Sequence, residues 1–257
     1  MNSSSTEEYC RHKAAVAGTN FYYSTLYYPA DIKRDLNALH AFHAEIEQVI
    51  EECTDPGVAH LKLAWWHEEI QRLFTDTARH PVARELSPVI SRYAIKATAF
   101  VDLIRHYEQL IQPAQPESYQ DFMDTLAQGP GIIWNLSARI CGFRDQDTPG
   151  IVSQMGCLFG LFYLMQSHRV NHQLYPDQQI EYFKRLIIDL EECCRRLPEV
   201  DCQTQTGALI LANIIMQTCD EIARDGYRLD QHRINLTPLR KLWIAWRTHK
   251  KVLRTED

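Results

Sequence analysis

The sequence predicts an all-α protein, and three observations carry that prediction. Apolar residues recur at spacings of three and four along most of the 257 residues, whereas strand-like alternation is nearly absent. Prolines and glycines stand between the periodic segments, where they open or end helices. With 45% hydrophobic residues, the chain is long enough to bury a sizeable core. We therefore expect one helical domain over residues 1–257.

The individual helices follow from this punctuation. A long helix is expected after Pro29, up to the turn residues Asp55, Pro56 and Gly57. The stretch from Gln128 to Gly131 breaks the chain before another helix. In chain order, the predicted helices cover residues 30–53, 61–74, 81 onward, 94–112, a segment through 138, and 148–169. Pro176, Pro198 and Pro238 divide the remainder.

Composition excludes several classes of protein. The formal net charge of −6 argues against a nucleic-acid partner. The polar start Met1–Glu8 has no apolar stretch, so we expect no secretory signal and a cytoplasmic location. The apolar run Leu158–Met165 is too short to span a bilayer. Eight cysteines occur without any C-x-x-C spacing, which predicts reduced, mostly buried thiols.

The C-terminal segment differs from the rest in charge. Residues 232–254 hold seven Lys and Arg and no acid, whereas residues 1–231 carry a net charge of −11. Thr237 and Pro238 predict the start of a helix, and one apolar face follows, formed by Leu239, Leu242, Trp243 and Trp246. One interpretation packs this face on the core and leaves the cations in water. The other is membrane-surface contact through residues 237–254, peripheral on the inner face of a membrane.

The helix predicted over 30–53 carries the candidate chemistry. His40, His43, Glu47 and Glu51 recur at three or four residues and so share one side of the helix. Glu47 and Glu51 could jointly hold a divalent cation through oxygen ligands, although such carboxylates are commonly a solvated surface. Together with the histidines they could instead favour Zn²⁺ or Fe²⁺. His168 and His172 are also spaced by four residues, off the face that Tyr163 and Ser167 share.

At this point the residues resemble the squalene/phytoene synthase family, most nearly its bacterial hopanoid-pathway presqualene diphosphate and squalene synthases. The stretch from Ala38 to Glu52 is similar to the first aspartate-rich helix, A-L-Y-x-F-C-R-x-x-D-D-x-x-D. Lys62 to Ile70 resembles the family's K-L-A-W-W-R-x-E signature. Further similar segments are 9–11, 18–24, 80–82, 136–140 and 236–243. The resemblance covers nearly the whole chain.

The resemblance implies the isoprenoid synthase fold, a single helical bundle around a central cavity. In that family two aspartate motifs bind Mg²⁺, which holds the diphosphate of farnesyl diphosphate as it leaves, and two substrates are joined head to head. Carried over, it implies Glu47 and Glu51 as metal ligands. The implied substrate-binding residues are Asn20, Phe21, Tyr22, His40, His43, Gln48, Tyr163, Ser167 and Asn171. Phe42, Phe159 and Phe162 are candidates for the cavity wall or for plain core.

The departures from the family pattern fall on the charged positions. The first motif reads Glu47, Gln48 and Glu51, and the preceding arginine is Ala44. A middle segment that is usually rich in aspartate has Tyr107 and Gln109 instead. At the second motif both aspartates and the arginine are replaced; the aligned residues are Gly160, Tyr163, Gln166, Ser167 and Asn171. Because Mg²⁺ prefers anionic oxygens, we expect it to bind weakly or not at all.

Three functions stay open on these grounds. The first is a non-catalytic isoprenoid-binding, regulatory or assembly-factor-like protein with a protein partner, since the superfamily also contains respiratory complex I assembly factors with eroded motifs. The second is an active prenyltransferase that condenses farnesyl diphosphate with a reduced metal site. The third is a peripheral membrane module that uses the basic terminal helix. The candidate ligands are an isoprenoid diphosphate or an apolar lipid, and no nucleic acid.

Overall fold

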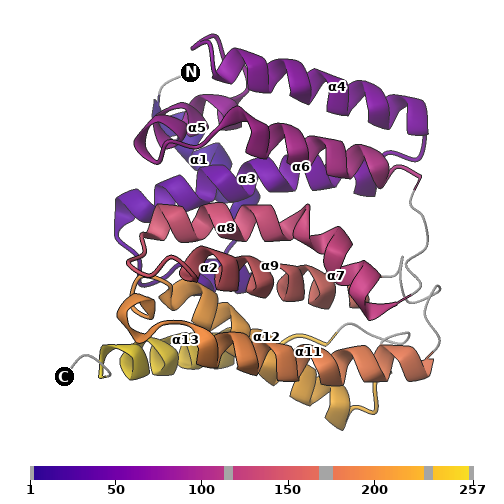
Figure 1. Cartoon of the computed structure of the whole chain (residues 1–257), viewed down its shortest axis with the longest axis vertical. Helices are drawn as coiled ribbons and strands as arrows, with labels where there is room; N and C mark the ends of the chain where they lie inside the picture. Colours follow the sequence, from indigo (N-terminus) through magenta and orange to yellow (C-terminus); the bar gives the residue numbers. More distant parts are fainter. Residues whose placement is uncertain (1–2, 113–117, 168–175, 229–233, 255–257) are drawn as a thin grey trace. The chain divides into compact units, whose positions relative to one another are not determined.

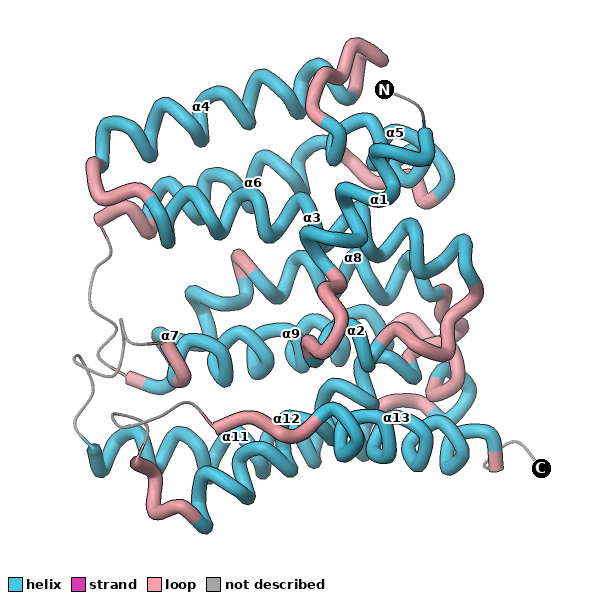
Figure 2. The backbone as a smooth tube through the Cα atoms, turned by 180° about the vertical axis from the view of Figure 1, so that it is seen from behind, coloured by secondary structure: helices cyan, strands magenta, loops and turns pink. Residues whose placement is uncertain are grey.

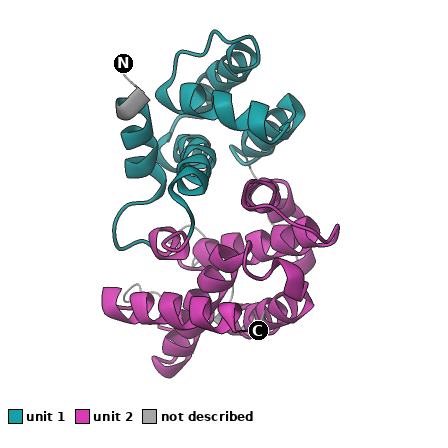
Figure 3. Cartoon of the chain, turned by 90° about the vertical axis from the view of Figure 1, so that its left-hand side faces the viewer, with its two compact units in different colours: residues 1–19, 28–117 teal, residues 20–27, 118–257 magenta. Residues whose placement is uncertain are grey.

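In the computed structural model of this protein, the described residues are 3–112, 118–167, 176–228 and 234–254. They form α-helices and one 3-10 turn, with no strand among them, as Figures 1 and 2 show. This confirms the all-α prediction. The chain divides into two compact units, drawn in two colours in Figure 3: unit 1 holds residues 1–19 and 28–117, and unit 2 holds residues 20–27 and 118–257. The prediction of one domain over residues 1–257 stays a prediction.

In the described part of unit 1 there are five helices, four of which pack around a central one. They are α1 (Ser3–Ala14), α3 (Ala30–Glu52), α4 (Pro56–Leu73), α5 (Pro81–Arg92) and α6 (Ala97–Gln109). Helix α3 contacts the other four. Phe42 on α3 is fully buried and meets the rings of Trp66 and Phe100 edge-on, at centroid distances of 5.4 and 5.1 Å. Phe42 is therefore core.

Buried carboxylates hold the helices of unit 1 together. Glu85 on α5 accepts hydrogen bonds from the Thr6 hydroxyl of α1, at 2.7 Å, and from Arg34 of α3. Asp35 on α3 accepts from the Tyr93 hydroxyl at 2.9 Å and from Arg92 at the end of α5. Each carboxylate is buried and paired with a cation, so its burial is compensated.

Unit 2 is built around two apolar helices. Its elements are α2 (Asn20–Ser24), α7 (Tyr119–Ala127), α8 (Pro130–Cys141), α9 (Thr148–Met165), α11 (Pro176–Arg196), the 3-10 turn η1 (Glu199–Asp201), α12 (Thr206–Arg224) and α13 (Pro238–Leu253). Helix α9 contacts α7, α8, α11 and α12, and α12 also contacts α2 and α13. Phe159 and Phe162 on α9 are almost completely buried in this core.

Helices α8 and α9 approach each other closely because α9 carries glycines at the contact. A Cβ atom on Gly156 would lie 2.5 Å from the Trp134 side chain, and one on Gly160 would lie 2.7 Å from Pro130. Behind this contact, the buried Asp201 accepts hydrogen bonds from the backbone amides of Arg144 and Asp145 and from the Thr148 hydroxyl at 2.6 Å. Asp201 thereby fixes the α8–α9 connection.

The predicted helix bounds differ from the structure by three residues or more at several ends, one of which is the end of α6, at Gln109 and not at residue 112. Helix α4 begins at Pro56, not at residue 61, because Asp55 caps it by accepting from the amide of Val58 at 3.0 Å, and Pro56 suits a first helical turn. Helix α6 begins at Ala97 and not at residue 94, since Ala94 has a φ of 49°. Helix α9 ends at Met165 and not at residue 169.

The apolar segment in α9 is longer than the run Leu158–Met165 that the sequence indicated. The whole helix, not only residues 158–165, is long and apolar enough to cross a bilayer by length and composition, and 67% of it is buried inside the structure. That burial is typical of a core helix.

All eight cysteines carry free thiols, and four of them are buried: Cys10, Cys157, Cys193 and Cys219.

Candidate functional site

The candidate site in unit 1 lies along one side of α3. His40, His43 and Glu47 are partly buried, whereas the neighbouring Leu39 and Phe42 are completely buried. The spacing of three and four residues places these polar side chains on one stripe beside the buried apolar one. Glu51, one turn further, is exposed. The structure thus keeps the four predicted residues on one helix face.

His43 has a hydrogen-bond partner that helical spacing in the sequence did not indicate. Its Nε2 lies 2.7 Å from the hydroxyl of Tyr107 on α6, and the two rings meet edge-on. Burial lowers the pKa of His43 to about 4, and burial together with the nearby His43 lowers the pKa of His40 to about 3. His106, beside Tyr107, has its pKa lowered to about 4 for the same two reasons. At neutral pH these three imidazoles are therefore uncharged.

The acidic groups on this face are shifted towards their protonated forms. Burial raises the pKa of Glu47. The pKa of Tyr107 is raised well above its ordinary value, first by burial and then by the charges of Glu47 and Glu51. Among the residues that the structure describes, no group of three or more His, Cys, Asp or Glu side chains is placed to hold a metal ion. The α3 face thus offers two carboxylates, and its environment disfavours charge on the inner one.

Gln48 lies in a different network from Glu47. Lys13 on α1 donates a hydrogen bond to the Gln48 oxygen, and the Gln48 amide donates to Glu52 at 2.5 Å. Lys13 also lies 3.2 Å from Glu45, which accepts from the Tyr9 hydroxyl at 2.7 Å. These contacts join α1 to α3. The assignment of Gln48 to substrate binding stays a prediction, while its described partners are protein side chains.

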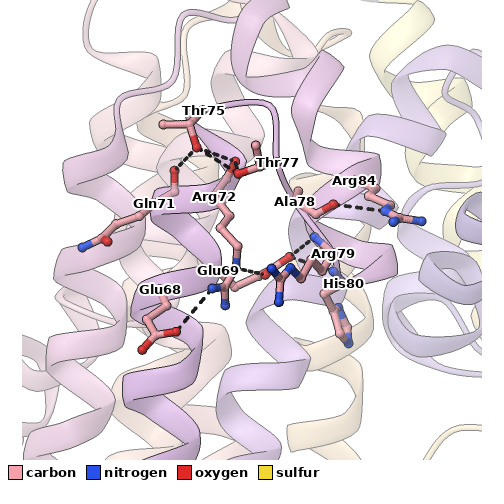
Figure 4. Close-up of polar contacts among 10 residues, drawn as sticks. All are labelled: Glu68, Glu69, Gln71, Arg72, Thr75, Thr77, Ala78, Arg79, His80 and Arg84. Atoms are coloured by element: carbon pink, nitrogen blue, oxygen red, sulfur yellow. Dashed lines mark hydrogen bonds and ion pairs between the residues drawn. The ribbon is translucent and has the colours of Figure 1, made fainter.

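The tryptophan signature on α4 has a structural role that Figure 4 shows in part. Glu69 is completely buried and accepts from the backbone amides of Arg79 and His80, at 2.5 and 2.7 Å, and from Arg72 at 2.9 Å. These hydrogen bonds hold its pKa below the ordinary value against the opposing effect of burial. Trp66 packs edge-on against His80 at 4.8 Å. The motif therefore fixes the α4–α5 connection.

In unit 2 the structure brings together two predicted residues that are 143 positions apart. The side-chain amide of Asn20 on α2 donates to the hydroxyl of Tyr163 on α9 at 3.2 Å. The Asn20 side-chain oxygen is buried without a hydrogen-bond partner. Phe21 and Tyr22, next on α2, are partly buried, and Phe21 meets Trp134 edge-on at 6.5 Å. The Asn20 amide and the Tyr163 hydroxyl are thus neutral polar groups among aromatic side chains.

The structure describes the second motif only as far as Ser167, just after the end of α9. The Ser167 hydroxyl donates to the Leu164 carbonyl at 2.7 Å, which satisfies it within its own helix end. Asn171, with His168 and His172, lies outside the described residues. The site residues that spacing alone missed are Tyr107 and His106, because a contact between helices leaves no periodic signal within either one. Only the departure from the family pattern at Tyr107 pointed to that position.

The comparisons with known proteins agree with the fold. The family model described as "Squalene/phytoene synthase" matches residues 14–175. Among solved structures, squalene synthase HpnC from Alicyclobacillus acidocaldarius matches with a TM-score of 0.69 and 19% identity, over 88% of this chain and 95% of that one. A dehydrosqualene synthase in complex with ligand matches with a TM-score of 0.78 and 15% identity, over 98% of both chains. The isoprenoid synthase fold is thereby confirmed.

The curated relatives carry a different description. The chain is 21% identical, over 60% of its length, to a Mus musculus protein described as NADH dehydrogenase (ubiquinone) complex I, assembly factor 6. It is 20% identical, over 61% of its length, to the Homo sapiens protein of that description. The matches cover 46% and 47% of those proteins, so the chain spans about half the length of the curated relatives it matches. Because the family model matches more than half of the chain, this protein belongs to the squalene/phytoene synthase family.

Proposed function

We propose that this chain is a non-catalytic family member that binds a neutral isoprenoid or another apolar lipid and acts as an assembly-factor-like partner of another protein. One observation carries the proposal: the α3 face is poor in charge at the positions where the family pattern calls for a diphosphate and its metal ions. His40 and His43 are neutral, burial raises the pKa of Glu47, and Ala44 takes the position of the family's arginine.

The chemistry of diphosphate release explains why charge decides the question. A leaving diphosphate gains negative charge, and metal ions or arginines must stabilise it. Mg²⁺, if held by Glu47 and Glu51, would supply that charge. Two carboxylates on one helix, with no third donor grouped beside them in the described part of the chain, support at most a weakly held ion. Removal of a diphosphate is therefore expected to be strongly impaired.

The same face suits an uncharged polar group. The His43–Tyr107 pair and the neutral His40 offer hydrogen-bond donors and acceptors without net charge. A prenyl alcohol would place a hydroxyl beside such groups, while its hydrocarbon chain would need apolar surroundings. A dehydrosqualene synthase that shares this fold was solved in complex with a ligand, which supports ligand binding on this fold. The curated relatives, described as assembly factors, support a protein partner.

Turnover by the purified chain tests the non-catalytic part. We expect no squalene, presqualene diphosphate or phytoene-type product from farnesyl diphosphate with Mg²⁺ or Mn²⁺, above a heat-denatured control. A product that disappears in Glu47→Ala but survives in Gln48→Ala would establish the alternative, a prenyltransferase with a reduced metal site. If neither substitution changes the yield of product, a contaminating enzyme is its source. Both variants and the unaltered chain are therefore purified and assayed in parallel.

Genetic complementation tests the assembly-factor part. In the source organism, deletion of the gene is expected to lower the amount of assembled NADH dehydrogenase without lowering squalene or carotenoid content. Glu47→Ala is expected to restore the assembled enzyme as well as the unaltered gene does, because no catalysis is required of it. Loss of isoprenoid product on deletion, with normal NADH dehydrogenase, would contradict the proposal.

A further inference from the structure

The C-terminal helix α13 presents two faces of different character. It is capped by Thr237, whose hydroxyl accepts from the amide of Arg240. Its inner face is buried against the rest of unit 2, through Lys241, Ile244, Ala245 and Val252. The Lys241 ammonium lies 6.0 Å from the centre of the Tyr23 ring. Lys241 is thus a buried cation, contrary to the expectation that all cations of this helix lie in water.

The outer face of α13 holds the large apolar side chains. Trp243 and Trp246 are 49% and 50% exposed, Leu242 is 45% exposed, and Leu239 is 80% exposed. At 100° per residue, these four lie within an arc of about 100°. Single exposed apolar residues are ordinary, but four large ones on one helix face form a patch that marks an interaction surface. The interpretation that packed this face on the core is wrong.

Cations border this patch on one side. Arg254, Arg247 and Lys251 are exposed and follow the apolar arc over about the next 80° of the helix circumference, and the exposed Lys250 lies at that edge of the arc. The guanidinium of Arg247 lies 5.2 Å from the centre of the Trp243 ring. Arg240 is paired with Glu221 of α12 at 2.6 Å, and that carboxylate also binds Arg224. Residues 238–254 contain no acid.

We propose that the α13 face, formed by Leu239, Leu242, Trp243 and Trp246 with Arg247, Lys250 and Arg254, binds the surface of an anionic lipid bilayer. Leu and Trp side chains at this spacing enter the boundary between headgroups and acyl chains, and the adjacent cations meet the lipid phosphates. The pattern of charge argues against a second copy as the occupant, because pairing two such faces would set cation against cation. Half-exposed tryptophans suit an interface that is apolar on one side and wet on the other.

Co-flotation with vesicles tests the proposal with the full chain. Vesicles of phosphatidylcholine mixed equally with phosphatidylglycerol are compared with vesicles of phosphatidylcholine alone. We expect binding to the mixed vesicles, with a shift of tryptophan emission to shorter wavelength. Arg247→Gln/Lys250→Gln is expected to lose about 30-fold in affinity for the mixed vesicles, from about 1 kcal/mol per cation. Trp243→Ser/Trp246→Ser is expected to lose binding to the mixed vesicles.

Matched controls distinguish vesicle binding by the α13 face from non-specific binding by other exposed residues. Leu61→Ser removes an apolar side chain that is 73% exposed on α4, and Lys62→Gln/Lys96→Gln removes two exposed cations of unit 1; neither is expected to change binding. Because all substituted residues are exposed, melting temperatures should match that of the unaltered chain. Equal vesicle binding by the Trp243→Ser/Trp246→Ser variant, or none by the unaltered chain, would overturn the proposal. So would a dimer in sedimentation velocity that this variant abolishes, since a second copy would then occupy the face.

Discussion

Glu69 and Glu47 are two carboxylates of unit 1 whose surroundings have opposite effects. Glu69 at the α4–α5 connection accepts two backbone amides and one guanidinium, and these donors keep its pKa low despite complete burial. Glu47 on the α3 face has its pKa raised by burial. The first carboxylate is a structural part of the family's tryptophan signature. The second costs stability when charged, because burial disfavours its charged form.

Replacing each glutamate with glutamine is the strongest test of this difference between Glu69 and Glu47. Glu69→Gln is expected to cost about 3–5 kcal/mol in the free energy of unfolding, because it breaks a buried ion pair and weakens two amide contacts. Glu47→Gln is expected to be neutral or stabilising, because it removes a charge that burial disfavours. Urea denaturation of the two variants side by side measures the difference. Equal losses would show that Glu47 is as structural as Glu69.

The histidines of the α3 face give the second test, through pH. The pKa values of His40 and His43 are lowered to about 3 and 4, whereas an unfolded histidine titrates near 6.5. The unfolded state therefore binds protons first as pH falls. Stability should be fully present above pH 6.5 and decline towards pH 4, by at most about 1.4 kcal/mol per pH unit for each histidine.

Substitution assigns that slope to its source. His43→Gln is expected to flatten the fall in stability between pH 6.5 and 4, followed by thermal denaturation at each pH. His60→Gln, which removes an exposed histidine of α4, serves as the control and should leave the slope unchanged. An unaltered slope in His43→Gln would mean that this imidazole is already charged in the folded protein.

Two tyrosines provide the smallest and most closely matched comparison. Tyr107→Phe removes a hydroxyl bonded to a neutral imidazole, and Tyr119→Phe removes one that donates to the Asp189 carboxylate at 2.7 Å. The first is expected to cost about 1 kcal/mol and the second about 1.5–3 kcal/mol, since bonds to charged groups are stronger. Chemical denaturation decides the order. A larger loss for Tyr107→Phe would indicate a charged His43.

Much of the fold could be predicted because helix ends are local. Proline and capping residues gave α3 to within one residue and the starts of α5 and α9. The start of α4 was missed because Pro56 and Gly57 indicate a stop as readily as a first turn, and only the bond from Val58 to Asp55 distinguishes the two.

The sites needed three-dimensional information. The stripe of His40, His43, Glu47 and Glu51 followed from helical spacing, but Tyr107 reaches His43 from 64 residues away. In α13, the buried face (Ile244, Ala245) and the exposed face (Trp243, Trp246) are both apolar, so periodicity alone could not say which one packs. Lys241 is also buried, on the side of the helix away from the tryptophans.

Calorimetric titration with farnesol and with farnesyl diphosphate, each with and without Mg²⁺, tests the central claim most directly. If the α3 face is poor in charge and suited to a neutral ligand, farnesol binds at least as tightly as farnesyl diphosphate, and Mg²⁺ changes neither affinity. His43→Phe then weakens farnesol binding, while His60→Phe does not. Tighter binding of farnesyl diphosphate that is strengthened by Mg²⁺ and lost in Glu47→Gln would contradict the account.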